Sequence, residues 1–350
     1  MSGKTKIFLI GATGYIGGAV LSKLLQHPSR TTFEVTVMVR THEKAQKFES
    51  LDVRAIVGSY KEDRALLEKC VEGAHVVFSC ADADDLGSVQ AVLRGLRRRH
   101  AILGDLPILI HTSGTGILTK NQETRGMRTT DVIYDDSNFE QIASIEPDAP
   151  HRNVDLAIFQ ADKEGYVKAY FVLPSTIYGI AQTALAEHGL QNPHSQQIPR
   201  LILASLDRGE AGMVGKGQAF WPNVHIDDVS ELYIKLWDAI VRDPEGVDHG
   251  VRGYYFGENG EHLWYDVSKA IAQALLELGL TTNPEPTPFT DLELEKYFGS
   301  VAMGELNGAN SRARGTHSRA LGWEPRYTTQ DMLASIKPEI LALIEQQKQN

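Results

Sequence analysis

A glycine-rich segment near the start of the chain has the residues and spacing of a phosphate-binding turn. It runs from Gly11 to Gly18 as GATGYIGG, between the apolar run Lys6 to Ile10 and a segment of helical periodicity, Gly17 to Gln26. Glycines at this spacing let the backbone turn tightly and approach a pyrophosphate, whose charge then lies at the N-terminus of the helix. The alternative is a glycine-rich turn without a ligand. We predict a dinucleotide site, and we assign to it Gly11, Thr13, Gly14, Tyr15, Ile16 and Gly17.

Basic residues follow the second predicted strand, Glu34 to Val39, where the ribose of a bound dinucleotide is expected. Arg40 occupies this position, about 20 residues after the glycines, and no carboxylate precedes His42. An acid here would bind a free 2′-hydroxyl, whereas an arginine accommodates a 2′-phosphate. We therefore expect NADP(H) as the cofactor, held in part by Arg40 and Lys44. In the alternative interpretation, Arg40 is a solvated charge at the end of a strand.

The first 180 residues alternate short β-branched runs with helical patterns, which predicts a parallel sheet. We expect an α/β fold with a Rossmann-like, doubly wound parallel sheet over residues 1–180, to which later segments near 223–257 return. Open α/β sheets bind ligands at the carboxyl ends of their strands. Further cofactor contacts are therefore assigned to residues at such ends, namely Cys80, Ala81, Thr112, Pro174 and Thr176. The expected strands are Lys6 to Ile10, Glu34 to Val39, Val53 to Val57, His75 to Cys80, Pro107 to Thr112 and Val167 to Leu173.

From Tyr178 the pattern changes to irregular segments rich in Gly, Pro, Asn and Gln, and residues 181–350 predict a smaller, interrupted substrate-binding domain. Val251 to Phe256 is expected to return as a strand. The proline-rich segment Thr281 to Pro288 is expected to be an extended, stiff linker. The expected helices are Ile198 to Arg208, Asp227 to Ile240, Tyr265 to Leu278 and Gln330 to Gln346.

The composition is that of an ordinary globular protein and argues against several classes of partner. The chain has 350 residues, a formal net charge of −10 and 42% hydrophobic residues. An acidic protein is a poor ligand for nucleic acid, and no run approaches the length of a membrane span. With only Cys70 and Cys80 there is neither a disulfide framework nor a metal-ligand spacing. We expect a cytoplasmic protein without bound metal that binds a small-molecule substrate, and a homodimer is the assembly we consider.

Several strings together resemble the extended short-chain dehydrogenase/reductase family over nearly the whole chain. Further motifs, at His111, Tyr134, His151 and Gly253, are similar to those of a fungal group of epimerase/dehydratase-like proteins related to the NmrA-like family. The resemblance implies the Rossmann-like fold and a nicotinamide cofactor. The strings are GATGYIGG, Arg40, His111-Thr-Ser-Gly-Thr115, Leu173-Pro-Ser-Thr-Ile-Tyr-Gly179 and Val224-His-Ile-Asp-Asp228.

This family ordinarily donates a proton from the tyrosine of a Tyr-x-x-x-Lys helix, and the chain departs from that pattern. Its Tyr-x-x-x-Lys is Tyr265 to Lys269, in the C-terminal part, which we interpret as accidental. Where the family's helix should begin, the sequence has His151 and Asp155, whose spacing puts both on one helical face. Imidazole exchanges protons near neutral pH, and a carboxylate can orient it. We expect this pair to be catalytic; the alternative is that both residues only cap and solvate the helix.

Other candidates for the site remain open. The family's catalytic hydroxyl aligns with Gly114, so Ser113 is our preferred replacement, with Thr115 beside it as a substrate contact. Tyr134 is a third candidate donor. Nucleotide-sugar epimerases of this family place an arginine for the diphosphate where this chain has Trp221, so Trp221 and Phe220 predict a flatter, more apolar substrate. Arg312 and Arg314 are expected either to meet an anionic group or to pack between the domains.

These features predict an NADP(H)-dependent oxidoreductase that acts on a carbonyl, imine or conjugated alkene of a small, partly aromatic metabolite. Two alternatives stay open. One is an NmrA-like dinucleotide sensor that has lost turnover together with the Tyr-x-x-x-Lys motif. The other is an isomerase or cyclase that retains its nucleotide.

Overall fold

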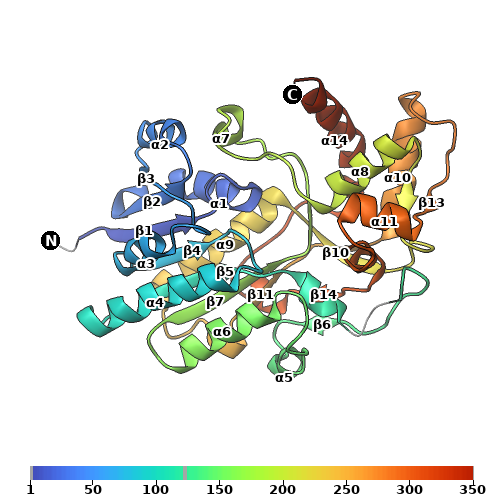
Figure 1. The fold of residues 1–350 in the computed structure, drawn as a ribbon. Helices are drawn as coiled ribbons and strands as arrows, with labels where there is room; N and C mark the ends of the chain where they lie inside the picture. The colour runs from blue at the N-terminus through green and yellow to red at the C-terminus, as the bar shows by residue number, and fades with distance from the viewer. Residues whose placement is uncertain (1–2, 121–123, 350) are drawn as a thin grey trace.

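A single parallel sheet of seven strands forms the centre of the computed structural model, which describes residues 3–120 and 124–349 (Figure 1). The strand order reverses beside β1, where the chain begins its second half of the sheet, so the sheet is doubly wound as predicted. All neighbouring pairs are parallel. In spatial order the strands are β11 (Tyr254–Gly257), β7 (Lys168–Pro174), β5 (Ile108–Thr112), β4 (Val76–Ser79), β1 (Thr5–Ile10), β2 (Phe33–Val39) and β3 (Arg54–Val57).

Helices cover both faces of this sheet, because a parallel sheet has apolar side chains on both sides. Alternation along β1 shows the division, since Ile7 and Leu9 pack into one core while Phe8 and Ile10 pack into the other. Figure 1 shows the two layers of helices above and below the strands. The first layer is α1 (Tyr15–Leu25), α2 (His42–Glu49) and α9 (Ile226–Arg242), and the second is α3 (Arg64–Glu72), α4 (Leu86–Leu103) and α6 (Arg152–Lys163).

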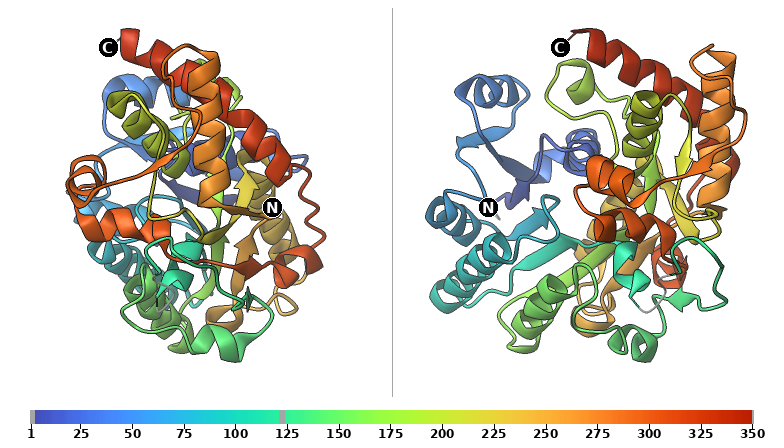
Figure 2. Two further views of the ribbon diagram at one scale, coloured as in Figure 1. Left: turned by 90° about the vertical axis from the view of Figure 1, so that its right-hand side faces the viewer. Right: turned by 45° about the vertical axis from the view of Figure 1, so that its right-hand side comes forward.

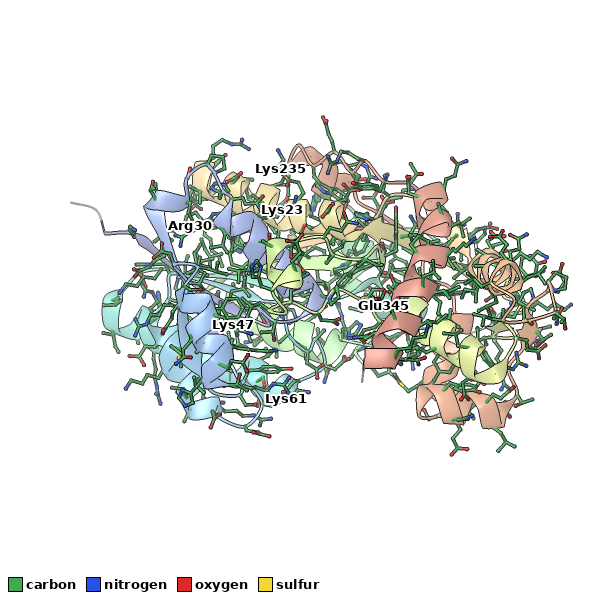
Figure 3. All side chains as sticks on the ribbon, turned by 90° about the horizontal axis from the view of Figure 1, so that it is seen from above. Lys23, Arg30, Lys47, Lys61, Lys235 and Glu345 are labelled. Carbon is green, nitrogen blue, oxygen red and sulfur yellow. The ribbon has the colours of Figure 1, made fainter. Side chains whose placement is uncertain are left out.

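A third core lies beyond the carboxyl ends of the strands, and we call the elements around it the C-terminal lobe (Figure 2). Its small sheet has the order β12, β10, β8, and its largest fully buried side chains include Trp264 and Tyr178. Seen from above, α14, which carries Glu345, lies at the junction with the N-terminal part, whose rim carries Lys23, Arg30 and Lys47 (Figure 3). The elements are β8 (Thr176–Tyr178), β10 (Phe220–His225), β12 (Glu261–Leu263), α8 (Gln197–Arg208), α10 (Trp264–Glu277) and α14 (Thr329–Gln349).

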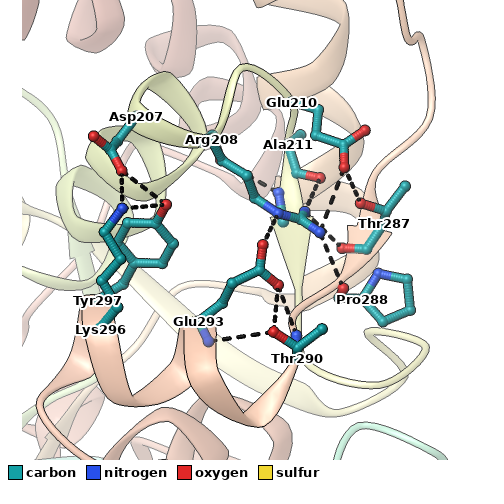
Figure 4. Close-up of polar contacts among 12 residues, drawn as sticks. Asp207, Arg208, Glu210, Ala211, Thr287, Pro288, Thr290, Glu293, Lys296 and Tyr297 are labelled. Carbon is teal, nitrogen blue, oxygen red and sulfur yellow. Dashed lines mark hydrogen bonds and ion pairs between the residues drawn. The ribbon is translucent and has the colours of Figure 1, made fainter.

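Arg208, the last residue of α8, connects several segments of this lobe (Figure 4). Its Nε donates to Glu293 at 2.6 Å, and its Nη2 donates to the carbonyl of Pro288 at 3.2 Å. Glu293 also completes a capping box with Thr290 at the start of α11 (Asp291–Phe298). The predicted linker, Thr281 to Pro288, is therefore part of the lobe: it ends in β13 (Thr287–Pro288), which pairs with β9 (Gly212–Met213).

Short elements from distant parts of the chain meet beside the large sheet. β6 (Tyr134–Asp135) pairs in parallel with β14 (Ala313–Arg314), so the segment after β5 and the segment before α13 lie side by side. This pairing holds the long loop after β5 against the C-terminal part of the chain. The remaining short helices are α5 (Phe139–Ala143), α7 (Ala184–Glu187), α12 (Val301–Glu305) and α13 (Thr316–Ala320).

The expected strands and long helices are all present, and most of their ends agree within about two residues. One strand differs at its start: Gly250–Arg252 form a 3-10 turn, so the returning strand begins at Tyr254 rather than Val251. Gly250 has a φ of +61°, a conformation that an extended strand does not contain. Over residues 3–120 and 124–349, no helix is both long and apolar enough to cross a bilayer.

Candidate functional site

The turn between β1 and α1 packs backbone directly against backbone. Gly11 has a φ of +89°, and a Cβ there would lie 2.6 Å from the carbonyl oxygen of Cys80. A Cβ at Gly17 would lie 2.2 Å from the carbonyl oxygen of Gly11. At Gly14, by contrast, a Cβ would meet only the Gly11 oxygen, at 3.2 Å, and would otherwise point into open space. Two glycines are therefore required by packing, and Gly14 is the position that leaves the turn open.

The N-terminus of α1 has the features of an anion site. Gly14 is its N-cap and provides no side-chain cap, and the first turn contains no acidic residue. The first N–H groups of a helix lack intrahelical acceptors and carry a partial positive charge. The open face at Gly14 and these uncapped N–H groups fit the phosphates of a dinucleotide.

A segment that follows β8 packs over the same turn. The amide N–H of Asn192 donates to the carbonyl of Thr13 at 3.0 Å, and the side chain of Gln191 donates to the carbonyl of Tyr15 at 2.9 Å. The buried hydroxyl of Tyr15 donates to the carbonyl of Gly179. Ile16 is half-buried beside them. Tyr15 is therefore a structural member of the turn, and its polar atoms are held by the chain itself.

Arg40 is exposed immediately after β2, as predicted, and is not ion-paired to any residue in the described part of the chain. Lys44 is half-buried in α2, where its amide N–H donates to Thr41 Oγ1. Tyr60 lies near Arg40; burial raises the pKa of its phenol, and the charges of Lys61 and Arg40 oppose that rise. Arg40 is therefore exposed at the end of β2, and its charge acts on the Tyr60 phenol.

The five residues assigned to the cofactor at other strand ends differ in exposure. Burial raises the pKa of the Cys80 thiol to about 12, although a hydrogen bond with Thr112 opposes the rise. Thr112 Oγ1 also bonds to the hydroxyl of Tyr233, at 2.7 Å. These two side chains thus point into the core. Ala81 is half-buried, whereas Pro174 and Thr176 are buried. Thr176 Oγ1 has no hydrogen-bond partner among the described residues.

His151 lies at the carboxyl edge of the sheet, immediately before α6. It is the N-cap residue of α6 and has a φ of +65°, a left-handed conformation that non-glycine residues adopt in only a few per cent of cases. A Cβ at Gly114 would lie 3.3 Å from His151 Nε2, and a Cβ at Gly116 would lie 3.1 Å from it. The imidazole therefore occupies the space beside the end of β5, and the two glycines make room for it.

The other ring nitrogen of His151 contacts a residue that the sequence did not reveal. His151 Nδ1 is 2.8 Å from the Asp84 Oδ1, on the loop after β4. Burial of the ring disfavours its charged form, but the hydrogen bond and charge of Asp84, with the charges of Asp155 and Asp82, raise the pKa of His151. The His151 side chain is 23% exposed, so solvent reaches part of the ring. The only signal in the sequence was a cluster of aspartates after a strand, at 82, 84 and 85.

Asp155 does not orient His151, so that part of the prediction is wrong. Its side chain is fully buried, and its Oδ2 accepts hydrogen bonds from Ser113 Oγ at 2.9 Å and from the hydroxyl of Tyr254. Arg152 donates to the Tyr254 oxygen at 3.1 Å, which places a positive charge behind this pair. Burial raises the pKa of Asp155 to about 6, and the hydrogen bonds of Tyr254 and Ser113 oppose that rise.

His111 is a second histidine at this edge that sequence reasoning missed. It is buried, and its Nε2 lies 3.9 Å from Asp155 Oδ1. Neither ring nitrogen has a hydrogen-bond partner among the described residues. Burial, followed by the charge of His151, lowers the pKa of His111 to about 3, so this ring is neutral. Its motif position was noted, but nothing in the sequence indicated that it faces Asp155.

The remaining candidates lie in other surroundings. Tyr134 is half-buried on β6, and burial, with the charge of Glu146, raises the pKa of its phenol. Among residues 3–120 and 124–349, no hydrogen bond joins it to His151 or Ser113, which bond to Asp84 and Asp155 instead. Thr115 is buried; its carbonyl accepts from Ser311, and its Oγ1 has no partner in the described chain. Tyr134 is therefore not brought together with the other proposed donors.

The two aromatic residues assigned to the substrate belong to β10. Trp221 is 6% exposed, and its Nε1 donates to the carbonyl of Ala309 at 2.7 Å. Its ring meets that of Trp264 edge to face, with centroids 6.0 Å apart. Phe220 is half-buried beneath the guanidinium of Arg312. The contacts of Trp221 are packing contacts, and its role toward a substrate stays a prediction.

The arginines that could meet an anionic substrate have a partner within the chain. Arg312 makes two hydrogen bonds to Glu261, at 3.0 and 2.8 Å, and Arg314 lies 3.7 Å from the same carboxylate. The Tyr-x-x-x-Lys on α10 is also engaged, because Tyr265 and Lys269 both bond to Glu285. No cluster of three or more potential metal ligands occurs in the part of the chain that the structure describes.

Comparison with known sequences gives relatives over nearly the full length. The NmrA-like family matches residues 3–93. A protein of Acremonium named Oxidase ucsJ is 30% identical over 335 residues, which cover 91% of this chain and 92% of that protein. An uncharacterized protein of Saccharomyces cerevisiae is 24% identical over 336 residues, covering 92% of this chain and 95% of the relative.

Solved structures share the fold at lower identity. The UDP-glucose 4-epimerase of Thermotoga maritima has a TM-score of 0.64 at 15% identity and covers 98% of this chain and 99% of its own. The dTDP-glucose 4,6-dehydratase of Bacillus anthracis, solved in complex with NAD, has a TM-score of 0.61 at 15% identity, with 97% of each chain covered. At this identity the likeness is one of fold.

The packing of the glycine turn predicts different effects for two equal substitutions. Gly17→Ala should destabilise the protein by about 2 kcal/mol or more, because its Cβ would meet backbone rather than a mobile side chain. Gly14→Ala should leave the free energy of unfolding within about 0.5 kcal/mol of that of the original protein. It should weaken NADPH binding at least tenfold, because the methyl group occupies the open face. Urea denaturation and NADPH fluorescence titration measure the two effects. An unchanged affinity in Gly14→Ala would place the dinucleotide elsewhere.

The buried Asp155 predicts a pH dependence of stability. Its folded pKa of about 6 lies above the unfolded value of about 3.9, so the folded state binds more protons between these values, and its stability falls as pH rises through that window. Asp155→Asn removes this titration. Between pH 4 and pH 7, the difference in unfolding free energy should shift in favour of Asp155→Asn by on the order of 2 to 3 kcal/mol.

Urea titrations of both proteins at several pH values test this expectation. Burial also raises the pKa of Asp136 to about 6. Asp136 is present in both proteins, so its contribution cancels in the difference of their unfolding free energies and it serves as the internal control. A difference that stays constant with pH would show that Asp155 does not titrate in this window.

Proposed function

The chain belongs to the NmrA-like group of the extended short-chain dehydrogenases/reductases, a family of NAD(P)-dependent oxidoreductases, and on that premise we propose that it is an NADP(H)-dependent enzyme. Its substrate is a small, partly aromatic metabolite with a carbonyl, imine or conjugated alkene. The observation that carries this proposal is the position of His151, an accessible imidazole at the same sheet edge as the open glycine turn. A sensor without turnover would not need such a group.

The residues that would hold the dinucleotide come from the first two strand ends. The uncapped N-terminus of α1 and the open face at Gly14 would receive its phosphates, and the bound group would supply or accept a hydride. Arg40 and Lys44 favour a 2′-phosphate, because neither side chain is ion-paired in residues 3–120 and 124–349. NADP(H) rather than NAD(H) is therefore the proposed cofactor.

His151 is the proposed proton carrier. Its Nδ1 is engaged by Asp84, so the proton exchanged with a substrate is the one on Nε2, which faces Gly114 and Gly116. For a carbonyl or imine in the reducing direction, the substrate oxygen or nitrogen would take this proton while its carbon gains a hydride, and the imidazolium would become neutral imidazole until water reprotonates it. Ser113 is not the proposed proton carrier, because its hydroxyl already donates a hydrogen bond to Asp155.

Part of the C-terminal lobe favours an uncharged substrate. Arg312 is paired with Glu261 through two hydrogen bonds, which leaves it less able to bind a diphosphate, while Arg314 lies 3.7 Å from the same carboxylate. Trp221 stands where related epimerases carry an arginine, and its indole offers no charge. These residues favour an apolar, partly aromatic metabolite over a nucleotide sugar.

Arg40→Asp tests the cofactor assignment. Loss of its charge-assisted hydrogen bonds should weaken NADPH binding by about 10- to 100-fold and leave NADH binding within about threefold. Lys47→Asp is the matched control, because it makes the same charge reversal on α2 at a lysine that is paired with Glu43. Fluorescence titration gives both dissociation constants. Equal affinities for NADPH and NADH in the original protein would refute the preference.

His151→Asn tests the proton carrier. Asparagine tolerates the left-handed backbone at this position better than most residues, so the helix start is preserved while the titratable ring is lost. Turnover should fall by about 10² to 10⁴, with NADPH affinity nearly unchanged. The assay is NADPH consumption against a panel of quinones, enones and cyclic imines.

Three further variants make this experiment decisive. Tyr265→Phe should retain activity within about threefold, because Tyr265 lies on α10 and its hydroxyl bonds to Glu285. Ser113→Ala and Tyr134→Phe test the rival donors. If His151→Asn keeps full turnover while one of these rivals loses it, the imidazole only caps α6; NADPH binding without turnover on any substrate would favour a sensor.

A further inference from the structure

We propose that Asp84 is the positioning residue of this site: its carboxylate holds the Nδ1–H of His151, so that Nε2 is the atom that gains and loses the proton. The two side chains come from different elements, the loop after β4 and the first position before α6. The distance from Nδ1 to Asp84 Oδ1 is 2.8 Å, within the range of a charge-assisted hydrogen bond. The inference rests on the proposed function only where it concerns turnover.

The loop after β4 holds Asp84 in place through its neighbours. Asp82 accepts the amide N–H of Asp84 at 3.0 Å, and its other oxygen is bound by Lys61 at 2.7 Å. Asp85 caps α4 by accepting the amide N–H of Ser88. Asp82 and Asp85 thus bond to residues of this loop, to Lys61 and to the start of α4. Asp84 is the aspartate whose carboxylate bonds to His151, at the start of α6.

His151 is held by its backbone position and by its neighbours at the start of α6. As the N-cap of α6 it lies outside the regular helix, and its φ of +65° is a left-handed conformation. Sparsely populated backbone conformations persist where surrounding contacts maintain them, and they concentrate at functional sites. The bond to Asp84 and the close approach of Gly114 and Gly116 are such contacts.

The charges around the ring come from three elements. Asp84 and Asp82 face it from the loop after β4, Asp155 from α6, and the neutral His111 from β5. Burial disfavours the imidazolium, and the three carboxylates together outweigh burial, so the pKa of His151 is raised. Asp84 contributes most among the carboxylates, because it alone combines a hydrogen bond with its charge. Its own pKa is lowered by the same bond.

Asp84→Asn separates charge from geometry. The amide oxygen still accepts Nδ1–H, but the negative charge is gone, so the pKa of His151 should fall by about 1 to 3 units. Asp82→Asn is the matched control: it removes one charge from the same loop, keeps the acceptor for the Asp84 amide, and should lower the pKa of His151 by much less. The measurement is the pH titration of imidazole signals by NMR, with His151 assigned from its loss in His151→Asn.

A second measurement uses the unaltered protein. Long-range ¹H–¹⁵N spectra report which nitrogen of a neutral imidazole carries hydrogen, and the bond to Asp84 requires the Nδ1–H form. Finding the Nε2–H form, or equal pKa shifts in Asp84→Asn and Asp82→Asn, would overturn the proposal. Neither observation needs a substrate.

Turnover then distinguishes this proposal from the proposed function. If both hold, the fall of the reduction rate with rising pH should move to lower pH in Asp84→Asn by the same shift that NMR reports. If NMR shows the shift while His151→Asn retains full turnover, Asp84 positions the ring as proposed but His151 is not the proton carrier. Loss of turnover in His151→Asn without the NMR shift would keep the proton carrier and refute Asp84.

Discussion

The contact of three backbone segments beneath the glycine turn is the constraint on which the site depends. Gly17 lies against the carbonyl of Gly11, and Gly11 in turn lies against the carbonyl of Cys80. Neither contact leaves room for a Cβ, so α1 begins directly above the junction of β1 and β4. The loop after β4 starts from this same point, and therefore the position of Asp84 is set relative to the dinucleotide turn.

Two buried carboxylates connect C-terminal segments of the chain to the sheet and its helices. Asp136 accepts the amide N–H groups of Phe256 and His317, at 2.8 and 2.7 Å, and Asp228 accepts those of Arg326 and Tyr327. Burial of a carboxylate is costly, and multiple N–H donors offset part of that cost. Burial still raises the pKa of Asp136 and of Asp228, so these groups organise the chain more than they stabilise it.

The sheet, its helices and the glycine turn could be predicted because each depends on local pattern. Alternating strands and helices, the glycine spacing and Arg40 all stand in the printed sequence, and the structure places them as expected. The segment Thr281 to Pro288 could not be predicted in the same way. Its prolines correctly indicate an extended chain, but its bonds to Arg208 and its pairing with β9 depend on residues about 75 positions away.

The pair His151 and Asp155 shows why the chemistry of the site was only half predictable. A spacing of four residues places two side chains on one face only if both belong to the helix. His151 is instead the N-cap in a left-handed conformation, while Asp155 lies within α6 and turns into the core toward Ser113. The histidine therefore turns to a carboxylate 67 residues earlier in the chain, and no periodicity within α6 could have indicated Asp84. What the sequence does contain is the room for the ring: glycine at 114 and 116, where a Cβ would lie 3.3 and 3.1 Å from His151 Nε2, so that the ring would have to give way by a few tenths of an ångström.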